Sequence, residues 1–175
     1  MRRISILAMF MAIGLISCGG GGGVANNTPL PNSIQDMQLQ NIVTGDQAKQ
    51  QIEELHQKPV TSGESYVGEY KGKNYTAKMY VTTYTGRDSA LAALQQMSSM
   101  MMNPHDDAMS MGFQHVRKLS KYGDNVYMAL KGNRAHYFYV EGKDLYWLDV
   151  DPHVAMAAMQ QLVGTKASAD STGMM

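Results

Sequence analysis

The chain has 175 residues, and its 15 basic and 15 acidic side chains balance to a formal net charge of zero. This balance argues against a nucleic-acid-binding protein and against binding to anionic lipid, because both need local clusters of Lys and Arg. The length allows one ordinary domain with one core, and the single cysteine allows no internal disulfide.

The N-terminus has the pattern of a secretory signal peptide over residues 1–17. Two arginines precede an apolar run that is shorter than the roughly 20 residues a membrane-spanning helix needs. The residues Leu15-Ile16-Ser17-Cys18 resemble the lipobox of bacterial lipoproteins. The resemblance implies cleavage before Cys18, transfer of a diacylglyceryl group to its sulfur, and usually acylation of the new N-terminus. Two alternatives are an ordinary secretory signal with an incidental cysteine and a buried apolar helix.

Lipidation of Cys18 determines the expected location. Two or three acyl chains, palmitate among them, hold a protein stably at a membrane, because each buried methylene contributes about 0.8 kcal/mol. In lipoproteins of enteric-type bacteria, a residue other than aspartate after the cysteine favours the outer membrane, and Gly19 stands there. We therefore expect a lipid-anchored protein of the bacterial cell envelope, on the periplasmic face of the outer membrane or on the cell surface.

Composition divides the remaining chain into a tether, a domain and a tail. Residues 18–40 comprise the lipidated cysteine and a glycine-rich stretch with few large apolar side chains, a composition typical of a flexible tether. Residues 41–164 are expected to form a single domain. Residues 165–175 are small and polar, which is typical of a disordered tail.

Three helices are predicted within the domain. The first begins at the capping box Thr44-Gly45-Asp46-Gln47 and ends before Pro59. The second begins after Thr85 and carries apolar residues at helical spacing until Pro104. The third begins at Asp151-Pro152, where a carboxylate cap precedes a proline in the first turn.

Between the helices the apolar period changes to two, which predicts strands. The six expected strands cover 65–70, 75–84, 112–119, 125–130, 134–140 and 145–150, and glycines stand between them where tight hairpins need them. This order predicts an α+β fold, an antiparallel sheet of about six strands with about three helices packed on one face.

A methionine-rich segment over residues 97–115 provides the candidate metal site. Thioethers select Cu(I), and imidazole extends the range to Cu(II). The segment is similar to the methionine motifs of periplasmic copper-handling proteins, and the candidate ligands are Met97, Met101, His105, Met109, Met111 and His115. Met97 and Met101 can equally be core residues of the second helix, because methionine fills irregular gaps.

Other chemistry has little support in the sequence. No hydrolase, nucleotide-binding or zinc-protease motif is found, and Cys18 is no nucleophile once it carries lipid, so no catalytic or further cofactor-binding residues are assigned. The run Asp149-Val150-Asp151-Pro152-His153 could hold a hard cation, but a cap role already explains Asp151. Tyrosines on both faces of the predicted sheet are consistent with core packing or with a binding surface.

These observations favour a non-catalytic binding or interaction module of the cell envelope. Its expected partners are the membrane, through the lipid on Cys18, and an envelope protein or glycan. The alternative is a periplasmic copper-binding lipoprotein that uses the segment 97–115.

Overall fold

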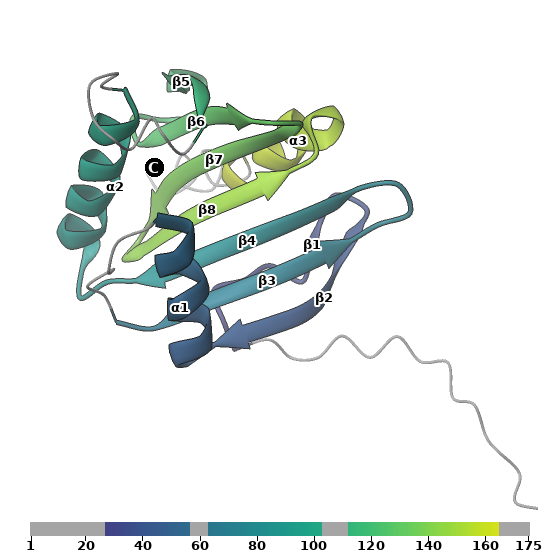
Figure 1. Ribbon diagram of the computed structural model, residues 1–175, viewed down its shortest axis with the longest axis horizontal. Coiled ribbons are helices and arrows are strands. Elements are labelled where there is room, and N and C mark those ends of the chain that lie inside the picture. Colours follow the sequence, from purple (N-terminus) through teal and green to yellow (C-terminus); the bar gives the residue numbers. More distant parts are fainter. Residues whose placement is uncertain (1–26, 57–62, 103–111, 165–175) are drawn as a thin grey trace, which may run out of the picture.

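The computed structural model describes residues 27–56, 63–102 and 112–164 (Figure 1). These residues form one eight-stranded sheet in the order β1-β2-β3-β4-β8-β7-β6-β5, in which neighbouring strands are antiparallel. The strands are β1 (Ser33–Ile34), β2 (Met37–Thr44), β3 (Ser65–Lys71), β4 (Thr76–Thr83), β5 (Gln114–Lys118), β6 (Val126–Lys131), β7 (Arg134–Glu141) and β8 (Asp144–Val150).

The helices are α1 (Gly45–His56), α2 (Arg87–Met102) and α3 (Pro152–Met159), which continues into a π-helical turn, η3 (Gln160–Gly164). A 3-10 turn, η2 (Ser120–Tyr122), lies between β5 and β6. The α+β class with three helices is therefore confirmed within the described ranges. The sheet, however, has eight strands rather than about six.

Of the two additional strands, β1 and the first half of β2 lie where the tether was predicted, and the second half of β2 lies at the start of the predicted domain. A register shift between Leu39 and Asn41 places a bulge in β2, so its apolar residues do not alternate regularly and the strand pattern is hidden. The folded part of the chain thus begins before residue 41. The first part of the predicted tether, 18–26, lies outside the described residues.

Residues 27–36, which we call the N-terminal strap, are fixed across one face of the sheet. Leu30 and Ile34 are buried there. The hydroxyl of Tyr70 donates a hydrogen bond to the carbonyl of Pro31 at 2.9 Å, and that of Tyr146 donates to the carbonyl of Pro29 at 3.3 Å. These tyrosines bury their rings and satisfy their hydroxyls at the same time, so they join the strap to the sheet.

Helices cover both faces of the sheet, and the prediction of a single covered face is wrong. Figure 1 shows α1 in front of the sheet and α3 behind it. On β8, Trp147 packs in the core cluster of α2, whereas its neighbour Leu148 packs in the cluster that includes α3. Because successive strand residues point to opposite faces, a strand that is apolar at consecutive positions needs cover on both sides.

Candidate functional site

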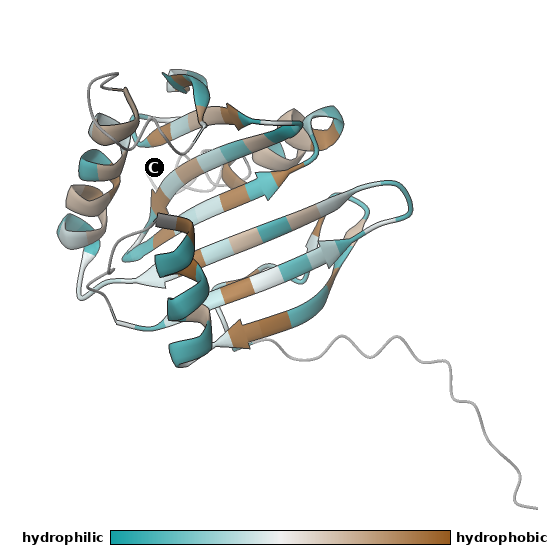
Figure 2. Cartoon of the chain, in the orientation of Figure 1, coloured by the Kyte–Doolittle hydropathy of each residue, from teal (hydrophilic) through white to brown (hydrophobic). Residues whose placement is uncertain are grey.

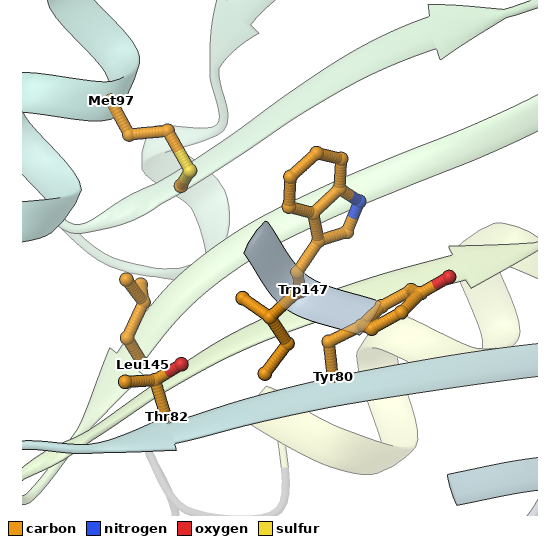
Figure 3. A pocket seen from close by; sticks show the side chains of 6 residues that line it. Tyr80, Thr82, Met97, Leu145 and Trp147 are labelled. Atoms are coloured by element: carbon orange, nitrogen blue, oxygen red, sulfur yellow. The ribbon is translucent and has the colours of Figure 1, made fainter. Parts of the chain in front are cut away.

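A crevice between α1 and α2 is the candidate functional site (Figure 3). Strands β4 and β8 form its floor and the two helices contribute its walls. The crevice is shallow, with a cavity volume of about 20 Å³, which is room for roughly one water molecule. It is lined by Ile52, Tyr80, Thr82, Met97, Leu145 and Trp147.

Strand register explains why these side chains meet. Tyr80 on β4 lies directly opposite Trp147 on β8, and Thr82 lies opposite Leu145 two residues further along. Residues two apart on a strand share a face, so all four point to the side that carries α1 and α2. Figure 3 shows Met97 reaching toward this row from α2. The site is consequently apolar, with two hydroxyl groups at its floor.

Trp147 is held rigidly in this floor. Its indole Nε1 donates a hydrogen bond to Nδ1 of His136 at 3.1 Å, and its ring packs edge-on against Phe138 with centroids 4.6 Å apart. His136 is only 5 % exposed, and this burial lowers its pKa to about 4. Its imidazole is therefore neutral near pH 7, and a neutral ring is what lets Nδ1 accept the indole proton.

Charged side chains border the crevice, but they neutralise one another. Lys78 pairs with Glu69 at 3.4 Å, and Arg134 forms an ion pair with Asp149. Burial, together with the negative charges of Asp149 and Glu69, raises the pKa of Tyr80 to about 12. The phenol is thus protonated at neutral pH, and the charged side chains described at the border of the crevice are paired.

The structure places the predicted copper ligands in different surroundings. Met97 and Met101 are 7 % and 5 % exposed and pack in the apolar cluster of Phe113, Phe138 and Trp147. His115 lies exposed on β5. The remaining candidates, His105, Met109 and Met111, lie outside the described residues. Met97 and Met101 thus lie in one cluster, and core packing accounts for their positions.

The side chains of Asp149, Asp151 and His153 do not all meet at one point, although Nδ1 of His153 lies 2.8 Å from Oδ1 of Asp151. Asp149 pairs with Arg134, whereas Asp151 caps α3, accepting a hydrogen bond from the backbone N–H of His153 at 2.9 Å. This bond lowers the pKa of Asp151. Across the described ranges, no cluster of three or more His, Cys, Asp or Glu side chains is placed to hold a metal ion.

The crevice itself was not predicted from the sequence. Its lining residues come from four elements, and each one alone has the pattern of an ordinary core position. The available signal was the run of apolar residues on β8, which indicates burial on both faces. What the sequence could not provide is the distance between α1 and α2, which leaves the floor partly uncovered.

Cys18 lies outside the described residues. Among the residues that are described, no helix is long and apolar enough to cross a membrane. Comparison with known proteins found no family model, no curated protein and no solved structure that matches this chain.

Proposed function

We propose that the chain is a lipid-anchored, exported protein of the bacterial cell envelope whose domain is a non-catalytic binding module. The observation that carries the anchor is the complete lipobox at Leu15-Ile16-Ser17-Cys18, in which the only cysteine of the chain occupies the lipidated position. The domain then binds its partner while it is held at the membrane.

The crevice supports a binding role over a catalytic one. Its lining is apolar and its bordering charges are paired. The two titratable groups with strongly shifted pKa values among the described residues of the site, Tyr80 and His136, are shifted away from neutral pH, so neither is poised to exchange a proton there. Its cavity volume of about 20 Å³ is far below the roughly 300–1,000 Å³ of small-molecule sites. The site is therefore a shallow apolar depression, which suits packing against the surface of a partner protein better than enclosing a ligand.

The anchor is tested by replacing Cys18 with serine in the full chain. We expect the variant to leave the membrane fraction while its domain stays folded, as judged by circular dichroism. If the Cys18→Ser protein stays in the membrane fraction, the lipid anchor is wrong.

The crevice is tested separately with a photoreactive residue. We expect p-azidophenylalanine in place of Tyr80 to cross-link to one envelope protein, identified by mass spectrometry. Tyr127, half-buried on the same face but outside the crevice, provides the matched control position. The cross-link should also disappear when Leu145→Trp fills the crevice. Equal yields at positions 80 and 127, or yields unaffected by the tryptophan, would contradict the proposal.

A further inference from the structure

The sheet ends in two edges with different chemistry. At one edge, β5 is short, has a register shift between Gln114 and Arg117, and ends in two cations, Arg117 and Lys118. A short length, a bulge and positive charges are the devices that prevent an edge strand from pairing with another chain. At the other edge, the eight residues of β2 include no charged side chain.

Among the described residues, most of β2 has no strand beside it on its outer side. β1 pairs only with Met37 and Gln38, so within the described part of the chain no strand pairs with the outer side of residues 40–44. An uncovered edge of this kind presents backbone N–H and C=O groups to a further strand. The chemistry that fits it is an extended polypeptide backbone.

Both faces of this edge also carry incompletely buried apolar side chains. Ile42 packs against the core on the α3 face, Val43 packs against the cluster under α1, and each remains half-buried. Figure 2 shows this hydrophobic end of β2 at the border of the sheet. A strand added here would cover Ile42 and Val43 as well as the backbone.

We infer that the occupant is the same edge of a second copy, paired antiparallel about a two-fold axis. Antiparallel self-pairing places each residue of the stretch 40–44 opposite another residue of the same stretch, and the stretch contains no charge that would repel its own copy. If β5 paired with its own copy instead, Arg117 and Lys118 would lie close to the same two cations of the second copy and would be repelled. An uncharged edge also offers a charged peptide no complementary group.

Five paired residues make a smaller interface than the roughly 1,600 Å² typical of stable complexes. The strength of the pairing therefore rests on the proposed anchor, since two copies in one membrane have a raised effective concentration.

The test uses the full chain in its membrane, with single cysteines at each position from 40 to 44 and a short bis-maleimide cross-linker. Because a two-fold axis brings one position opposite itself, we expect the dimer yield to peak at one position and to fall on both sides. Gln114→Cys, an exposed glutamine on β5, is the matched control for Gln40→Cys and should stay monomeric. A flat yield, a yield equal to that of Gln114→Cys, or a cross-link to a different protein would overturn the inference.

The unmodified chain separates this inference from the proposed anchor. Its only cysteine is Cys18, so a dimer formed by the unmodified chain would reveal a free thiol and contradict lipidation. The dimer yields at positions 40–44, after the yield of the unmodified chain is subtracted, would still show whether the two edges pair. As a second measurement, a lysine added next to the best cross-linking position lies diagonally across from its own copy and should lower the dimer yield roughly twofold through like-charge repulsion, whereas Gln114→Lys should leave it unchanged. No difference between these two lysine variants would also count against the pairing.

Discussion

The two faces of the sheet are built differently. On the α3 face one continuous core extends from the strap through β4, β8 and β7 to β6. On the opposite face the core is divided into a cluster under α2 and a smaller one under α1, and Tyr80 packs against both. The crevice lies at this division. The α3 face therefore buries the larger continuous core, while the α1–α2 face leaves part of its apolar floor uncovered between two smaller clusters.

The largest expected effect is the difference in stability between two leucine-to-alanine variants on β8. Leu148→Ala on the fully buried α3 face should lower the free energy of unfolding by about 2–5 kcal/mol, because it leaves a cavity. Leu145→Ala, at the half-buried crevice, should cost roughly 1 kcal/mol. Denaturant unfolding of both variants measures the difference. Equal losses would show that the two faces contribute alike.

The next effect is pH dependence from the crevice floor. The pKa of His136 is about 4 in the folded protein, against about 6.5 when unfolded, so between these values the unfolded chain binds more protons. The contribution of His136 to the free energy of unfolding is therefore fully present above pH 6.5 and decreases as the pH falls toward 4. Below pH 4 this contribution no longer changes. Over this window the free energy of unfolding should decrease by about 3 kcal/mol in total. His136→Gln should remove this component in denaturant unfolding across the window, while His115→Gln on exposed β5 should leave it unchanged.

A smaller effect concerns the strap. Tyr70→Phe removes the hydroxyl that donates to Pro31, leaving a part-buried carbonyl without this bond, and should cost about 1 kcal/mol of unfolding free energy. Tyr127→Phe on the crevice face is the matched control and should be nearly neutral. Thermal unfolding compares the two. A neutral Tyr70→Phe would mean that apolar contacts alone hold the strap.

The smallest expected effect concerns copper. Because Met97 and Met101 are core residues, titration of the folded full chain with Cu(I) against a competing chelator should show no binding tighter than micromolar that depends on them. Met97→Leu with Met101→Leu should bind as the unmodified chain does and should keep the fold, since the exchange nearly conserves volume. Tighter binding that is lost in the double variant would favour the copper-binding alternative.

Local signals predicted much of this fold. The cap at Asp151 and the helical spacing of α2 are properties of neighbouring residues, and the structure confirms both elements. Likewise, the glycines at 132 and 142 adopt positive φ in the hairpin turns where they were expected. Such features depend on backbone preferences that a short sequence window contains.

Long-range features could not be predicted in the same way. β2 was missed because its bulge interrupts the alternation, and the strand becomes recognisable only through its pairing with β3. The placement of α3 on the opposite face depends on which side the chain takes after Val150. The crevice depends on the separation of two helices, for which no single residue carries a signal.

The strap also limits how far the domain can travel. Asn27 is the first described residue, and nine Cα-to-Cα steps join it to Cys18. A fully extended chain advances at most about 3.6 Å per residue, so these steps reach no more than about 32 Å. With lipid on Cys18, this segment is short compared with a tether that continues to residue 40. If Cys18 carries lipid as proposed, the near side of the domain stays within a few nanometres of the bilayer.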